Sequence, residues 1–190
     1  MRIIRGKYKN RRIPVPTHFK ARPTTDFAKE GLFNILENNY VDFEDDQPTA
    51  LDLFAGTGSI SLELASRGCR QVVSIEKDFH HWQYLQRLAK ELDAKEWHPV
   101  HADVFKFARQ ATQQYDLVFA DPPYALPNLK DIPALVLGDK NGEAGDADRQ
   151  ALLAPGGIFI LEHGKDYDFT AHPRFLTHRN YGSVHFSFFR

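Results

Sequence analysis

The residues best suited to chemistry are Asp121-Pro122-Pro123-Tyr124, which directly follow a predicted buried strand. Two consecutive prolines remove two backbone N–H donors and restrict the chain, so the carbonyl of Pro122 points in a nearly fixed direction outside regular structure. That carbonyl and the Asp121 carboxylate can accept both N–H bonds of an exocyclic amine on a base. Such contacts favour a pyramidal nitrogen whose lone pair can attack an electrophilic methyl group. Tyr124 adds a ring on which an extracted base can stack.

We therefore assign Asp121, Pro122 and Tyr124 to catalysis of methyl transfer onto an amino nitrogen. The alternative is a structural turn that contains a tyrosine by chance. A glycine-containing loop on a neighbouring predicted strand favours the catalytic interpretation.

That loop is Asp52-Leu53-Phe54-Ala55-Gly56-Thr57-Gly58, between a predicted strand and a predicted helix. Its glycines allow a tight turn and close approach by a ligand, and the helix offers backbone N–H groups. A dinucleotide-binding fingerprint would need a third glycine where Ser61 stands. Asp52 instead suits the cationic groups of S-adenosylmethionine, and the backbone suits its carboxylate. The residues expected to bind this cofactor here are Asp52, Phe54, Ala55, Gly56 and Gly58, with a plain turn as the alternative.

Two further predicted strands are followed by acidic residues. Glu76 lies 24 residues after Asp52, where a carboxylate can accept hydrogen bonds from both ribose hydroxyls. The alternative for Glu76 is a surface acid that caps the next helix together with Asp78. Asp103 can accept the adenine amino group while Val104 or Phe105 packs on the adenine ring, although Asp103 is equally suited to capping a helix.

Alternating strand and helix patterns must position these residues. Short apolar strands are predicted at 50–54, 71–76, 98–102, 117–120 and 158–162. Helices are predicted at 26–39, 59–67, 79–93, 104–113 and 128–137, with an exposed loop at 138–148 and a short helix ending at 155–157. Segments 175–179 and 183–189 form a predicted antiparallel hairpin. This order predicts a doubly wound, mostly parallel α/β sheet closed by a C-terminal hairpin.

Charge is concentrated at the N-terminus, although the net charge is only −1. Residues 1–22 hold eight basic and no acidic side chains, which leaves 16 basic and 25 acidic ones in the remainder. The first sixteen residues also read as a small β-hairpin around a polar turn. A basic segment of this kind suits phosphate binding, with a merely solvated terminus as the alternative. The expected RNA contacts are Arg2, Arg5, Lys7, Lys9, Arg11, Arg12 and Arg22. We accordingly divide the chain into a basic arm, 1–22, and a catalytic domain, 23–190.

Composition excludes several other classes. With Cys69 as the single cysteine, no internal disulfide or cysteine-rich zinc site can form, and the nine histidines show no ligand spacing. No apolar run approaches the length of a membrane span, and no signal-peptide core follows the basic N-terminus. We expect a cytoplasmic monomer that uses neither a metal nor a membrane.

The motifs as a group closely resemble the RsmD-type family of 16S ribosomal RNA guanine-N2 methyltransferases. Besides the two loops above, the resemblance rests on Met1-Arg2-Ile3-Ile4, Gly6-Lys7-Tyr8-Lys9, Arg22-Pro23-Thr24-Thr25-Asp26, Leu32-Phe33-Asn34-Ile35-Leu36, Leu161-Glu162-His163 and Tyr181-Gly182. It implies a seven-stranded Rossmann-like methyltransferase fold that uses S-adenosylmethionine. It also implies an RNA-gripping N-terminal hairpin and one modified guanine in the small ribosomal subunit.

Some features depart from that family, and other acceptors remain open. Residues 27–31 are less basic than usual, and Lys90 or Glu91 stands where an asparagine is common. The Asp-Pro-Pro-Tyr motif also occurs in enzymes that methylate the adenine N6 amine of DNA or RNA. Enzymes that methylate a glutamine side chain in a protein usually carry asparagine in place of Asp121. A non-catalytic RNA-binding relative is the remaining alternative.

Overall fold

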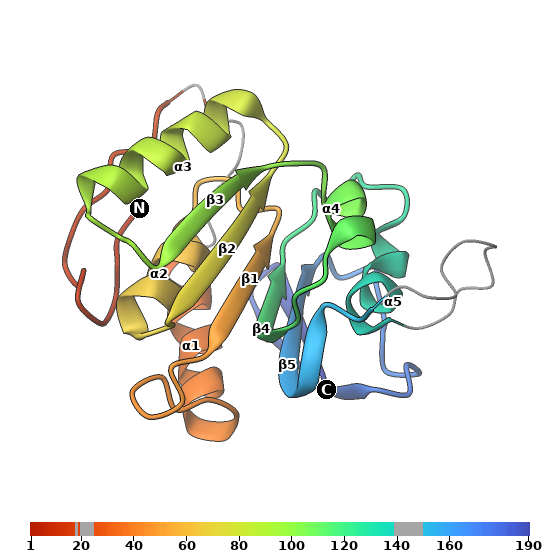
Figure 1. Cartoon of the computed structure of the whole chain (residues 1–190). Helices are drawn as coiled ribbons and strands as arrows, with labels where there is room; N and C mark the ends of the chain where they lie inside the picture. Colours follow the sequence, from red (N-terminus) through yellow and green to blue (C-terminus); the bar gives the residue numbers. More distant parts are fainter. Residues whose placement is uncertain (18, 20–24, 139–149) are drawn as a thin grey trace.

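The computed structural model describes residues 1–17, 19, 25–138 and 150–190, which form a seven-stranded sheet with helices on both faces (Figure 1). Its strands are β1 (Thr49–Leu53), β2 (Gln71–Glu76), β3 (Trp97–His101), β4 (Tyr115–Ala120), β5 (Leu153–His163), β6 (Phe175–Tyr181) and β7 (Val184–Phe189). The strand order is β3-β2-β1-β4-β5-β7-β6. The first five strands pair in parallel, whereas β7 pairs antiparallel with β5 and β6. The predicted doubly wound sheet with a C-terminal hairpin is confirmed.

Two separate clusters of buried side chains lie on the two faces of the sheet. The helices are α1 (Asp26–Asn39), α2 (Ser59–Arg67), α3 (Phe79–Glu91), α4 (Val104–Gln110) and α5 (Ile132–Leu137), the last preceded by a 3₁₀ turn, η1 (Leu129–Asp131). Apolar residues of α1, α2 and α3 pack in one cluster, and those of α4 and α5 in the other. The central strands are apolar on both sides because both faces are covered, and every residue of β1 is buried.

The short helix predicted to end at Pro155-Gly156-Gly157 is wrong, because β5 already begins at Leu153 and runs through this segment. The pairing of β5 with β4 is irregular there: Tyr115 pairs with Leu153, but Leu117 pairs with Ile158. Gly156 has a φ of 80°, a left-handed conformation that favours glycine. The glycines thus allow a bulged strand where the sequence indicated a helix end. Most of the predicted loop at 138–148 lies outside the described residues.

Three predicted helices are shorter than expected, and the one predicted at 79–93 ends at Glu91. The helix predicted at 104–113 ends at Gln110, and the one predicted at 128–137 begins as the 3₁₀ turn η1. These differences concern only element ends, which local sequence determines weakly.

The N-terminal segment is looped rather than a regular hairpin. Its only strand-like pairing among the described residues is one antiparallel bridge between Arg2 and Arg12. The predicted pair of strands does not form because the backbone turns into left-handed conformations at Gly6 and Asn10. A Cβ on Gly6 would lie 1.7 Å from the carbonyl oxygen of Ser66, so only glycine permits this close approach to α2.

The same segment contributes to the main core. Ile3, Tyr8 and Ile13 are buried in the cluster formed by α1, α2 and α3. The backbone N–H of Lys7 also donates to the Ser66 carbonyl at 2.8 Å. Residues 1–13 therefore pack as part of the folded body. Arg22 lies outside the described residues.

Candidate active site

The predicted site residues converge at one edge of the sheet, where the parallel strands end. Leu53 of β1 pairs with Ile75 of β2 and with Ala120 of β4, and Ala120 pairs with Leu161 of β5. This register brings four carboxylates from neighbouring strands to the same edge: Asp52, Glu76, Asp121 and Glu162. In an open α/β sheet, this carboxyl edge is where ligands bind.

The loop after β1 has an unusual backbone. Phe54, Gly56 and Gly58 all have positive φ, at 67°, 54° and 74°. Gly58 is the N-cap of α2 and provides no side-chain hydrogen bond to the helix. A Cβ at Gly58 would lie 2.6 Å from the side chain of Leu85. Only glycine therefore fits between the start of α2 and Leu85, and the first turn of α2 has no side-chain cap. A helix N-terminus without a side-chain cap suits an anionic group of a ligand.

Asp52 holds this loop from beneath. Its buried carboxylate accepts hydrogen bonds from the backbone N–H of Ser61, at 3.1 Å, and from the Ser61 hydroxyl. The hydroxyl of Ser74 and the indole N–H of Trp97 continue the buried chain, each at 2.6 Å. Burial raises the pKa of Asp52 to about 7, although the Ser61 hydrogen bonds oppose the rise.

Glu76 lies on the other side of the loop. One of its oxygens accepts from the backbone N–H of Gly56 at 2.8 Å, and the other accepts from the N–H of Asp78 at 2.7 Å. Asp78 itself caps α3 by accepting from the N–H groups of His80 and His81. Glu76 is therefore a nearly buried loop anchor at the sheet edge rather than a surface cap.

Asp103 caps α4, as its sequence context allowed. One oxygen accepts from the N–H groups of Phe105 and Lys106, and the other lies 3.0 Å from the Lys77 ammonium. Burial alone would raise the pKa of Asp103, but the Lys77 and backbone hydrogen bonds outweigh burial and lower it. Val104 is buried in the α4–α5 cluster, whereas Phe105 keeps more surface.

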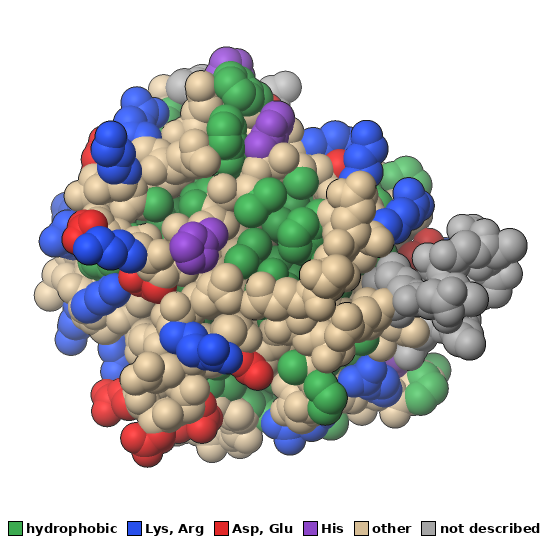
Figure 2. Space-filling view, viewed as in Figure 1, with side chains coloured by type: hydrophobic (Ala, Val, Ile, Leu, Met, Phe, Trp, Pro, Cys, Tyr) green, Lys and Arg blue, Asp and Glu red, His purple; other side chains and the backbone are tan. Residues whose placement is uncertain are grey.

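Hydrophobic surface borders this part of the site. In Figure 2, hydrophobic side chains gather between α3 and α4, beside the ends of β1 and β2. Ala102 and Phe105 are among the partly buried apolar residues on the α4 side. This apolar surface could pack against a flat ring that lies between Glu76, the candidate for ribose binding, and the start of α4.

The Asp121–Tyr124 segment follows β4 at the same edge. The N–H of Asp121 donates to the carbonyl of Leu53 at 3.4 Å, which ties the segment to the strand that carries the glycine loop. Burial raises the pKa of Asp121 well above its usual value, and the nearby Glu162 carboxylate raises it further. Pro122 is buried, while the ring of Tyr124 is half exposed. The pKa of Tyr124 rises to about 12 through burial and the two neighbouring carboxylates.

Comparison with known proteins identifies the family. A family described as conserved hypothetical protein 95 matches residues 1–190. A ribosomal RNA small subunit methyltransferase D from Haemophilus influenzae is 32% identical over 173 residues, which cover 87% of this chain and 80% of that protein. The chain belongs to this methyltransferase family. The RsmD-type resemblance expected from the sequence motifs is thus confirmed.

Solved structures confirm the methyltransferase fold. A hypothetical protein from Thermus thermophilus superposes with a TM-score of 0.78 at 25% identity, covering 100% of this chain and 99% of that one. The T. thermophilus 16S rRNA N2 G1207 methyltransferase RsmC, in complex with AdoMet and guanosine, gives a TM-score of 0.67 at 21% identity. That match covers 90% of this chain and 44% of the RsmC chain.

In this RsmD-type chain, the structure adds two site residues that the sequence assigned no role, Glu162 and His163. Glu162 is 4% exposed and lies beside Asp121. His163 is buried, with one ring nitrogen 2.8 Å from the carbonyl oxygen of Gly164 and the other 2.8 Å from the Ser187 hydroxyl. Burial lowers the pKa of His163, so the ring is neutral near pH 7. The sequence signal that could have identified these two residues is a pair of ionisable side chains at the end of an otherwise apolar strand.

A buried ionic cluster joins the N-terminal segment to α1 and α2. Glu63 accepts hydrogen bonds from the backbone N–H groups of Ile4, at 2.8 Å, and Arg5, at 3.0 Å. Its carboxylate also contacts Arg67 at 2.8 Å and Lys29 at 3.8 Å. The Lys29 ammonium in turn donates to the carbonyl of Arg2 at 2.6 Å. This cluster fixes the start of the basic segment against the helix that follows the glycine loop.

The basic residues predicted to contact RNA fall into two groups. Arg2, Arg5 and Lys7 form ion pairs with acids of the body, namely Asp26, Glu37 and Glu96. Lys9, Arg11 and Arg12 are exposed and form no ion pair within the part of the chain that is described. The second group therefore offers the more available positive charge.

Neither a metal cluster nor a membrane-spanning helix occurs in the described ranges. No three His, Cys, Asp or Glu side chains there are arranged to hold a metal ion. Likewise, none of the helices in the described residues is both long and apolar enough to cross a membrane.

Proposed function

We propose that this chain transfers a methyl group from S-adenosylmethionine to the exocyclic N2 amine of a guanine in 16S ribosomal RNA. The observation that carries the proposal is the adjacency of the glycine loop and Asp121. Asp121 follows β4, the direct neighbour of β1, and donates its N–H to β1 itself. A methyl donor held by the loop and an amine held by Asp121 would therefore meet at one strand edge.

The loop residues fit such a donor. The turn of the glycine loop into α2 suits the carboxylate of the cofactor, and the Glu76 carboxylate suits the ribose hydroxyls. Asp103 and the apolar surface near Phe105 suit adenine. When bound, S-adenosylmethionine supplies an electrophilic methyl group on a sulfonium. The proposed cofactor contacts remain Asp52, Phe54, Ala55, Gly56, Gly58, Glu76, Asp103 and Val104.

The acceptor residues would act on the amine. The Asp121 carboxylate and the Pro122 carbonyl accept its two N–H bonds and hold the nitrogen lone pair in line for attack. As the nitrogen would bond to the methyl group, the sulfonium–methyl bond would break and leave a neutral thioether. Asp121 would take up the proton that the nitrogen loses, for which a raised pKa is suited. Tyr124, half exposed above Gly164, provides the stacking face for the base.

Family membership and fold support an RNA acceptor. The H. influenzae relative is named a ribosomal RNA small subunit methyltransferase. The T. thermophilus RsmC structure, which has a similar fold, is described in complex with AdoMet and guanosine, and this supports a guanine acceptor. Since the proposed substrate is ribosomal RNA, we place the activity in the cytoplasm. We propose Lys9, Arg11 and Arg12 as the leading contacts to the RNA phosphates.

The test uses labelled S-adenosylmethionine with unmodified 16S ribosomal RNA, both naked and assembled in small subunits, followed by digestion to nucleosides. We expect N2-methylguanosine. Asp121→Ala should lower turnover on the order of hundreds-fold while leaving cofactor affinity unchanged. Methylated adenosine among the nucleosides would show that the acceptor base is adenine and not guanine. A methylated protein would show that the acceptor is not RNA. Cofactor binding without turnover on any RNA would indicate a non-catalytic relative.

A further inference from the structure

Phe27 is an unusually exposed aromatic residue for a folded enzyme. It lies in the first turn of α1, and 71% of its surface is accessible. Its ring meets that of Tyr181 nearly at a right angle, with centroids 5.6 Å apart. The two rings thus form an open aromatic corner on the surface, where a flat group could stack on one ring and place its edge against the other.

The Tyr181 side of this corner is held rigidly. A Cβ at Gly31 would lie 2.2 Å from the Tyr181 ring, so the ring packs directly on the bare backbone of α1. Tyr181 also contacts Phe186 of β7, with ring centroids 6.0 Å apart. A stacking surface that is fixed before binding loses little conformational entropy when a ligand arrives.

The corner opens onto a groove that carries amide and carboxylate side chains of α1. Phe27 and Tyr181 line a depression of about 510 Å³ together with Glu30, Asn34 and Asn38. Asparagine amides both donate and accept hydrogen bonds, as the edges of nucleobases require. Two aromatic rings that share a depression with amide side chains fit a single planar, polar ligand better than the broad apolar surface of a protein partner.

Strand register places the corner on the same edge as Asp121. Tyr181 ends β6 and pairs with Val184, and the next residue, His185, pairs with His163 at the end of β5. Three strand spacings of about 4.8 Å separate β4 from β6, so the ends of these two strands lie roughly 14 Å apart across the sheet. Arg2 is half exposed, and its guanidinium is 3.2 Å from Asp26, the residue before Phe27.

We propose that Phe27 and Tyr181 form a stacking subsite for an unpaired base of the RNA substrate, a few nucleotides from the methylated base. This proposal rests on the proposed function. Single-stranded RNA is recognised mainly by stacking on aromatic side chains, and such contacts tolerate any base. The subsite would hold the flanking strand so that the target nucleotide reaches Asp121.

Steady-state methylation of unmodified 16S ribosomal RNA tests the subsite. Phe27→Ala should raise KM for RNA at least about five-fold with kcat nearly unchanged, because stacking contributes to binding and not to the methyl transfer. Phe27→Tyr should retain the wild-type KM. Leu176→Ala is the matched control, since Leu176 is also an exposed apolar residue, 44% accessible, but lies at the other end of β6. An unchanged KM in Phe27→Ala would overturn the proposal.

A second readout does not need turnover. The same RNA containing 4-thiouridine, irradiated with the catalytically impaired Asp121→Ala protein, should crosslink to Phe27 or Tyr181. Crosslinks confined to other residues would overturn the subsite even if methylation proceeds. If Phe27→Ala raised KM only for assembled subunits, and no crosslink to RNA formed, the corner would instead contact a ribosomal protein. If wild type binds RNA and crosslinks here but methylates nothing, the subsite stands and the proposed function fails.

Discussion

At the scale of single residues, the carboxylates at the sheet edge have divided roles. Asp52 and Glu76 accept hydrogen bonds from the backbone of the glycine loop and the helix after it. Asp121 and Glu162 lie together at the acceptor side, where the charge of one disfavours the charge of the other. Crowded, buried carboxylates are costly in a protein without ligand, and such groups concentrate at functional sites. A cationic methyl donor would relieve that cost.

Asp52 provides a test through pH. Its folded-state pKa of about 7 lies above the ordinary value near 3.9, so the folded protein binds more protons between these pH values. The free energy of unfolding contributed by Asp52 therefore falls as pH rises through this window. Without cofactor, Asp52→Asn should unfold at a higher temperature than wild type at pH 8, and the gain should vanish near pH 4.

Asp103→Asn is the matched control, and its effect on the free energy of unfolding should have the opposite sign. The pKa of Asp103 is lowered, so its charged form stabilises the fold once pH exceeds the unfolded value. Its asparagine variant should therefore be less stable than wild type at pH 8. Thermal unfolding across pH 4–8 measures both variants. An Asp52→Asn variant that is less stable than wild type at pH 8 would show that the carboxylate is better solvated than the structure indicates.

At the scale of elements, the five parallel strands and the two loops that follow β1 and β4 were predictable because they depend on local pattern. Apolar runs bounded by Asp52, Glu76 and Asp121 indicated both the strands and the edge where they end. The ionic cluster of Lys29 and Glu63 was not predictable, since these residues lie 34 positions apart and meet only through packing. The extension of β5 through Gly156 was missed for a related reason, because a bulge depends on the neighbouring strand.

The cluster around Glu63 predicts a large stability effect. Glu63 is fully buried and pairs with two cations, so Glu63→Gln leaves Lys29 and Arg67 without a charge partner at that position. Breaking a buried ionic cluster by removing one partner costs about 3–5 kcal/mol. Denaturant unfolding should show this loss, and hydrogen exchange of the Ile4 and Arg5 amides should speed up. Asp26→Asn, which breaks the half-exposed pair with Arg2, should cost only about 0–1 kcal/mol. Equal losses of stability in Glu63→Gln and Asp26→Asn would contradict the role of Glu63 as the centre of a buried ionic cluster.

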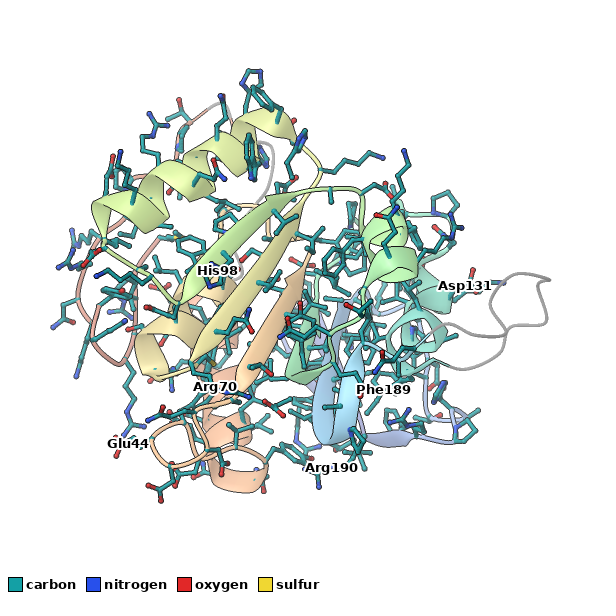
Figure 3. All side chains as sticks on the ribbon, in the orientation of Figure 1. Glu44, Arg70, His98, Asp131, Phe189 and Arg190 are labelled. Atoms are coloured by element: carbon teal, nitrogen blue, oxygen red, sulfur yellow. The ribbon has the colours of Figure 1, made fainter. Side chains whose placement is uncertain are left out.

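At the scale of the whole molecule, charge and fold act together. The basic N-terminal segment is anchored to the body through Ile3, Tyr8 and Glu63, so its exposed cations keep a fixed position relative to the site. The rest of the chain has an excess of acidic groups, which repel a phosphate backbone. RNA should therefore approach over the segment that holds Arg11 and Arg12. Arg70 and Arg190 lie at the opposite edge of the sheet, away from the strand ends that form the site (Figure 3).

Salt dependence of RNA binding tests this arrangement. Each phosphate contact steepens the log–log plot of affinity against salt by about 0.9 for duplex and about 0.7 for single strands. Replacing both Arg11 and Arg12 with alanine should weaken binding to 16S ribosomal RNA and flatten the slope by about one to two units, without changing which base is methylated. The Arg70→Ala/Arg190→Ala double variant removes the same charge from the remote edge and should keep the wild-type slope. If both double variants flatten the slope equally, net charge rather than a defined contact drives binding. If neither does, Arg11 and Arg12 merely solvate the segment.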